Sequence, residues 1–178
     1  MTEHVRDAAA TALIFGFFAS GWFGWAQDDP PPRWRPWLIA GSVASLVTAA
    51  VGGILMWRHW SDGTAFDRDT SIRFGIVVGI EFALAGIGAA VLAARRRSAL
   101  IPVWIALVVG VHLFPVAVLL GYPLIHVTAA LVTLAAVLAY PLARRRSVAP
   151  SAVVGVLTGA VLLLSALVSL VGSLLPDA

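Results

Sequence analysis

The sequence predicts an all-α, polytopic integral membrane protein, a compact bundle of six transmembrane helices joined by short loops. Of its 178 residues, 60% are hydrophobic and only 12% are charged, and the mean hydropathy is +0.94. Soluble domains carry about 25% charged residues. The apolar residues fall into six runs, each long enough to cross a hydrocarbon core of ~30 Å. We therefore expect a single transmembrane domain over residues 1–178, with no separate soluble part.

The six predicted spans follow one another with little chain between them. They cover residues 8–26, 37–57, 72–94, 100–120, 124–142 and 150–175. The N-terminal MTEHVRD mixes charges of both signs and no small-residue cleavage site follows it. The first run is therefore expected to be a retained helix rather than a signal peptide. Gly121 and Pro123 mark the turn that separates the fourth span from the fifth.

Arginine clusters occupy every second loop of this predicted topology. The loops after the first, third and fifth spans hold eight of the twelve basic residues, Arg33, Arg35, Arg95, Arg96, Arg97, Arg144, Arg145 and Arg146. Basic residues concentrate in short cytoplasmic loops. We therefore expect these loops in the cytoplasm and both termini outside, in a plasma membrane (the bacterial inner membrane). Trp104, close to the second cluster, fits an interfacial aromatic belt.

One acidic residue lies deep inside a predicted span. Glu81 comes two residues after Gly79, so it lies about 200° around the helix from the stripe of Gly75, Gly79 and Ala83. Small residues four apart allow close helix packing in lipid, and an intramembrane acid requires protein or water around it. Both faces of the helix at 72–94 then require neighbours, which predicts that this third helix is central.

The last two spans each place polar residues along one face. In the fifth span, His126, Thr133 and Tyr140 recur at steps of seven. In the sixth span, small and polar residues share a face that we expect in the interior: Ser151, Gly155, Thr158, Ser165, Ser169 and Gly172. A polar seam on a long apolar helix favours contact with a partner helix or a cavity.

His112 is the strongest candidate partner for Glu81, because the two are predicted to lie at similar depth. Pro115 follows it and removes one helical hydrogen bond. A Glu–His pair inside a membrane suits proton-coupled binding or a proton relay. The candidate ligand- or proton-binding residues are Glu81, His112, His126, Arg73, Thr133 and Tyr140.

These residues favour a transporter or a membrane-embedded small-molecule-binding subunit with a polar site in the outer half of the bilayer. An intramembrane enzyme that uses Glu81 and His112 as acid and base on a lipid-like substrate is a second hypothesis. A structural or assembly subunit with internally paired polar groups is a third. Expected partners are the lipid bilayer, a small-molecule ligand, and a second copy or another membrane subunit.

Several kinds of chemistry find no support in the sequence. The chain has no cysteine, and it carries no phosphate loop, dinucleotide fingerprint or nucleophile elbow. We expect no catalytic residue, no metal and no cofactor. Because the arginines lie in short loops between apolar runs, they indicate membrane topology rather than nucleic-acid binding.

The chain resembles one known family in size and in one motif. Ala8 and Ala12 give the first span an AxxxA start. With its six spans, the chain resembles the substrate-capture subunits of energy-coupling-factor vitamin transporters. The resemblance implies a substrate-capture role, with Ala8 and Ala12 at a coupling contact. The termini predicted to lie outside depart from that family.

Overall fold

The computed structural model describes residues 4–175, and the extreme termini lie outside the described residues. Six long helices follow in order: α1 (Val5–Trp25), α2 (Arg35–Arg58), α3 (Arg68–Ala94), α4 (Ile101–Leu120), α5 (Pro123–Arg146) and α6 (Pro150–Leu174). Short 3₁₀ turns, η1 (Pro32–Trp34) and η2 (Ser98–Leu100), precede α2 and α4. Each long helix is apolar and long enough to cross a membrane. The expected number and order of long apolar helices are confirmed, with boundaries that differ by a few residues, and the crossing of a membrane stays a prediction.

The sequence marks where these helices begin and end. Proline lies in the first turn of α2, α4, α5 and α6, where the missing amide hydrogen has no helical partner to lose. Asp67 caps α3, and its Oδ1 accepts a 2.7 Å hydrogen bond from the Thr70 amide. Gly121 ends α4 with a φ of 58°, the left-handed conformation that favours glycine. The chain can therefore turn directly into α5.

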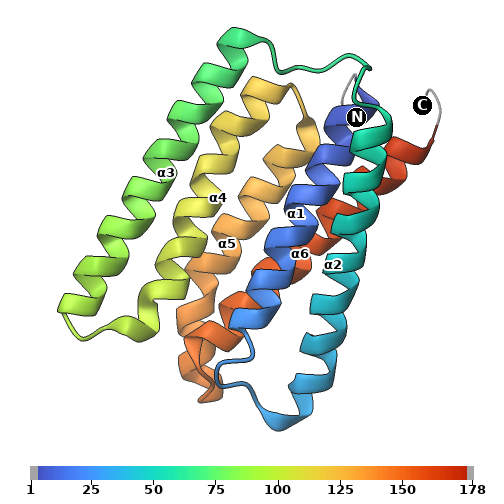
Figure 1. Ribbon diagram of the computed structural model, residues 1–178. Coiled ribbons are helices and arrows are strands. Elements are labelled where there is room, and N and C mark those ends of the chain that lie inside the picture. Colours follow the sequence, from blue (N-terminus) through green and yellow to red (C-terminus); the bar gives the residue numbers. More distant parts are fainter. Residues whose placement is uncertain (1–3, 176–178) are drawn as a thin grey trace.

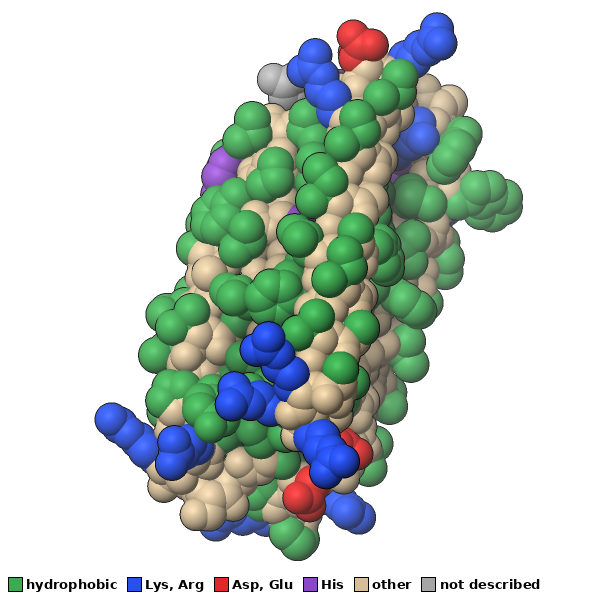
Figure 2. Space-filling view, turned by 90° about the vertical axis from the view of Figure 1, so that its left-hand side faces the viewer, with side chains coloured by type: hydrophobic (Ala, Val, Ile, Leu, Met, Phe, Trp, Pro, Cys, Tyr) green, Lys and Arg blue, Asp and Glu red, His purple; other side chains and the backbone are tan. Residues whose placement is uncertain are grey.

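The helices run alternately up and down, so the loops fall at two ends of the bundle (Figure 1). The three arginine-rich loops, α1–α2, α3–α4 and α5–α6, share the lower end in this view. Figure 2 shows the face that carries α3, with charged side chains toward the two ends and hydrophobic side chains between them. This arrangement fits a multi-pass membrane protein. The side of the membrane that each end faces stays a prediction.

The central helix of the bundle is α6, which contacts α1, α2, α4 and α5. Its backbone comes so close to α1 that a Cβ at Gly155 would lie 2.6 Å from the Trp22 carbonyl oxygen. The polar face expected in the interior is confirmed there, since its buried members include Ser151, Thr158, Ser165 and Ser169. One hydrogen bond to α5 satisfies Ser165, whose Oγ lies 2.7 Å from Thr128 Oγ1, whereas Thr158 Oγ1 is buried without a hydrogen-bond partner among the described residues.

The prediction that the third helix is central was wrong. Helix α3 lies at the edge of the bundle and packs along α4 (Figure 1). None of its residues is fully buried, and a Cβ at Gly75 or Gly79 would meet no atom within 4 Å. The error came from requiring a protein neighbour on both faces. A single neighbouring helix supplies the polar partner of Glu81, and the glycine face stays uncovered.

Hydrogen bonds and a cation–π contact join the α2–α3 loop to the start of α1. These contacts fix the position at which α3 begins. The buried Asp7 carboxylate accepts hydrogen bonds of 2.7 Å from the Thr64 hydroxyl and from the Ala65 amide. The Arg6 guanidinium donates to the Trp60 carbonyl oxygen at 3.0 Å and lies 4.0 Å from the centroid of that indole ring. These contacts hold the upper end of an edge helix that has little other support.

Candidate functional site

Glu81 lies midway along α3, thirteen residues from Arg68 and thirteen from Ala94. It belongs to the one face of α3 that is partly covered. That face contains Phe74, Val77, Val78, Glu81, Ala85, Gly88, Ala89 and Leu92, at the three- and four-residue spacing of a helix packed against one partner. The partner is α4, so the acid points toward the only long helix that α3 follows.

The residue of α4 that faces Glu81 is His112. The Glu81 Oε2 and His112 Nε2 atoms are 3.2 Å apart, and each side chain is only 16% exposed. The other ring nitrogen, His112 Nδ1, lies 2.8 Å from the Val109 carbonyl oxygen. A carbonyl only accepts, so we assign the Nδ1 hydrogen to that bond, which leaves Nε2 of a neutral imidazole as an acceptor.

This assignment fixes the number of protons on the pair. A carboxylate and an acceptor Nε2 repel each other, so the contact requires one proton between them. That proton gives either a carboxylic acid that donates to the imidazole or a carboxylate that accepts from an imidazolium. The pair has no net charge in either form. The Glu81–His112 pair is therefore a neutral unit that can gain or lose one proton.

No other ionisable side chain faces this pair within the described helices that surround it. In α3 the remaining charges are Arg68, Asp69 and Arg73, and Arg73 is eight residues, or about 12 Å, along the helix from Glu81. Helix α4 has only His112, α6 has none, and the ionisable side chains of α5, which packs along α4, are all exposed on the surface of the bundle. Within the described helices, Glu81 and His112 are therefore each other's only ionisable neighbours.

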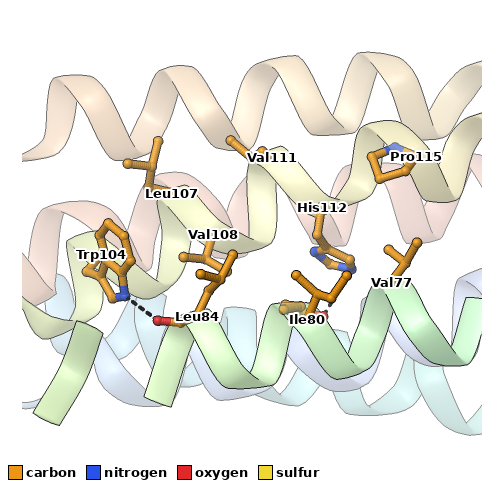
Figure 3. Close-up of a pocket in the computed structure, with 10 residues that line it drawn as sticks. Val77, Ile80, Leu84, Trp104, Leu107, Val108, Val111, His112 and Pro115 are labelled. Carbon is orange, nitrogen blue, oxygen red and sulfur yellow. Dashed lines mark hydrogen bonds and ion pairs between the residues drawn. The ribbon is translucent and has the colours of Figure 1, made fainter. Parts of the chain in front are cut away.

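A groove of about 380 Å³ lies beside the pair, between α3 and α4 (Figure 3). Apart from Glu81 and His112, its walls are apolar or aromatic: Val77, Ile80, Leu84, Trp104, Leu107, Val108, Val111 and Pro115. Ile80, Leu84 and Val111 are half-exposed on the flank of the bundle. The groove therefore opens sideways, onto the apolar surface, rather than toward either end.

Trp104 closes the end of the groove nearest the arginine-rich loops. Its indole Nε1 donates a 3.1 Å hydrogen bond to the Leu84 carbonyl oxygen across the helix interface (Figure 3). The ring rests on Gly88, where a Cβ would overlap it. This role was missed when Trp104 was interpreted as a belt residue. The available signal was a glycine on the facing helix at the depth of the indole.

Pro115 bounds the opposite end of the groove and changes the backbone there. It has no amide hydrogen, so the Val111 carbonyl oxygen, four residues earlier, lacks its usual helical donor. Val111 and Pro115 both line the groove. The helix beside His112 therefore has one carbonyl oxygen without its usual intrahelical donor.

The other predicted site residues lie away from this groove. Arg73, His126 and Tyr140 are exposed. Thr133 packs against α4, and within residues 4–175 its Oγ1 is buried without a hydrogen-bond partner. The polar residues of α5 thus divide between an interhelix contact and the surface. Of the six candidates, the structure brings together Glu81 and His112 alone.

The described residues 4–175 include no cluster of three or more histidine, aspartate or glutamate side chains placed to hold a metal ion. The AxxxA motif is inside the bundle: Ala8 and Ala12 are buried, and a Cβ at Gly52 of α2 would lie 3.1 Å from Ala12 Cβ.

No protein-family model matches this chain, and no curated protein or solved structure is significantly similar to it.

Proposed function

We propose that this chain is a multi-pass integral membrane protein that binds a small molecule in the α3–α4 groove, as a transporter or a ligand-binding subunit. The Glu81–His112 pair is the polar contact of the site. The observation that carries the proposal is the position of this pair, halfway along the helices and beside a groove that opens on the flank. A ligand then enters from among the acyl chains. Its polar group lies near mid-depth rather than in the outer half.

Binding explains two features that a purely structural pair leaves unexplained. A pair that only joined two helices would need no open volume beside it. Glu81 and His112 instead keep 16% of their side-chain surface exposed, next to a volume of about 380 Å³. Ionisable groups at such depth are costly, and they commonly mark ligand or ion pathways.

An intramembrane acid–base enzyme is the second candidate, and one observation favours it. Both members of the pair line one groove with lateral access, so a lipid-like substrate in that groove would meet an acid and a base together. Two further arguments favour a binding function over an enzymatic one. The shared proton lies between the two residues rather than facing the groove. The other lining side chains offer no free N–H or O–H group to stabilise a developing negative charge.

Thermal unfolding of the protein in lipid nanodiscs tests the binding proposal. The probes are three twelve-carbon amphiphiles: dodecanol, dodecanoate and dodecyltrimethylammonium. We expect at least one to raise the Tm of the wild type and to lose this effect in Val111→Phe, which fills the groove but leaves the pair intact. His126→Ala, an exposed histidine outside the groove, is the matched control and keeps the shift. Equal shifts in the wild type and Val111→Phe, or no shift with any probe, would refute the proposal.

A further inference from the structure

The hydrogen-bonding groups of the groove are nearly all acceptors. Glu81 supplies carboxyl oxygens, and the Val111 carbonyl lacks its helical donor. The potential donors are already engaged: Trp104 Nε1 donates to Leu84, and His112 Nδ1 donates to Val109. The remaining lining side chains are hydrocarbon. A site with acceptors and no free donors favours a ligand that donates hydrogen bonds or carries a positive charge, and it disfavours an anion.

The number of protons on the Glu81–His112 pair also indicates a positively charged ligand. While the pair holds its shared proton it is neutral, so a cation placed beside it would bring one uncompensated positive charge among apolar side chains. If the proton leaves, Glu81 is a carboxylate, His112 is neutral with its Nδ1 hydrogen still on Val109, and the cation is compensated. An anion would require a second proton on the pair and finds no other donor to bind.

The length of the groove defines the apolar part of such a ligand. Along α4, Trp104 precedes His112 by eight residues, or about 12 Å, whereas Pro115 follows it by three residues, or about 4.5 Å. Figure 3 shows Trp104 and Pro115 at opposite ends of the groove, with His112 nearer Pro115. A single apolar tail therefore fits only toward Trp104 and the arginine-rich end.

Resting on the proposed binding role, we propose that the ligand is a hydrophobic monocation of the alkylammonium type, and that its binding displaces the proton shared by Glu81 and His112, one for one. The cationic group lies against the Glu81 carboxylate and the Val111 carbonyl. Its tail extends toward Trp104. The displaced proton passes to water at the membrane surface. The only titratable groups that α3 and α4 direct at this position are Glu81 and His112, and Arg73 lies about 12 Å away along α3.

Titration calorimetry with dodecyltrimethylammonium in zwitterionic nanodiscs tests the exchange, because this probe has a fixed charge and any pH dependence belongs to the protein. We expect release of about one proton per bound probe, read from the dependence of the observed enthalpy on the ionisation enthalpy of the buffer. At pH values where the pair holds its proton, affinity should rise about tenfold per pH unit. Dodecanol should bind more weakly and release no proton.

Variants separate this inference from the proposed function. Glu81→Gln should release no proton, and its affinities for dodecanol and for the cation should be equal. His126→Ala should behave as the wild type. Binding of the cation by the wild type without proton release would overturn the exchange and leave the groove as a binding site. Equal affinity for dodecanol and the cation would overturn the charge preference alone. If Glu81→Gln fails to fold, the number of protons that the wild type releases per bound cation still tests the exchange.

Discussion

Glu81 Oε2 lies 3.2 Å from His112 Nε2, across the interface that attaches the edge helix α3 to the bundle. The same two side chains line the groove on the flank of that interface. The pair therefore contributes to the attachment of α3 and supplies the ionisable groups of the candidate site. Stability measurements and ligand measurements on the same variants separate the two contributions.

The attachment predicts energetic coupling between the two residues. In a double-mutant cycle with Glu81→Leu and His112→Leu, each single change removes one partner and leaves the other unpaired. The double variant leaves neither, so it should lose less stability than the sum of the two single losses. Interhelical polar pairs in membranes give coupling energies of about 0.6 kcal/mol, and at most about 1.7 kcal/mol. Unfolding of the four proteins in mixed micelles measures this energy, and strict additivity would show that the pair does not interact.

The contact of Trp104 with α3 predicts a large difference between two neighbouring glycines. Gly88→Ala adds a Cβ that overlaps the indole, so the ring must leave Leu84 or α3 must shift, at a cost of about 1–3 kcal/mol. Gly86→Ala is the matched control on the same helix, because a Cβ there meets no atom within 4 Å. It should be neutral or slightly stabilising, since alanine favours helix. Equal free energies of unfolding for the two variants would contradict the closure by Trp104.

The central position of α6 and the peripheral position of α3 predict opposite responses to added volume. Gly155→Ala places a Cβ against the Trp22 carbonyl oxygen of α1 and should strongly reduce the free energy of unfolding. Gly79→Ala, on the uncovered face of α3, should leave it nearly unchanged. The comparison needs only the thermal midpoints of the two variants in the same detergent. A larger loss from Gly79→Ala would restore the central placement of the third helix.

How much of this arrangement can be predicted from the sequence depends on the kind of evidence each feature needs. Six apolar runs and the prolines at helix starts suffice for the number, order and approximate limits of the long helices. The serines and threonines of α6 indicate its interior face, because small and polar side chains in an apolar helix gather where helices pack against one another. Similar depth on consecutive antiparallel helices makes His112 the candidate partner of Glu81, whereas the contact itself depends on how the two helices are rotated.

The position of α3 and the groove itself could not be predicted in the same way. An intramembrane acid requires one polar partner. The sequence of residues 75–88 does not indicate that the glycine face of this helix lacks a neighbouring helix. Small-residue spacing shows that close approach is possible, not that a helix makes it. The groove depends on how the Trp104 ring turns onto Gly88 and Leu84, which is a matter of helix rotation and side-chain rotamer.

The cap of α3 gives a prediction on pH outside the spans. The hydrogen bond from the Thr70 amide holds the pKa of Asp67 below its ordinary value of 3.8. A lowered folded-state pKa means that the carboxylate stabilises the first turn of α3 above pH 3.8. This contribution disappears as the pH falls through the lower, folded-state pKa. Hydrogen-exchange protection of the Thr70 amide should therefore decrease at acidic pH in the wild type. Asp67→Asn, which keeps a capping oxygen but cannot titrate, should show protection independent of pH across this range.

Photoaffinity labelling tests the central claim, that the α3–α4 groove holds a ligand through Glu81 and His112, more directly than any stability measurement. The probe is a twelve-carbon alkyltrimethylammonium with a photoreactive diazirine at the end of its chain, used with the protein in nanodiscs. We expect adducts concentrated in residues 101–108 of α4 and 84–88 of α3. They should disappear in Val111→Phe and fall sharply in Glu81→Gln. Labelling spread evenly over the lipid-facing helices, and unchanged by either substitution, would contradict the central claim.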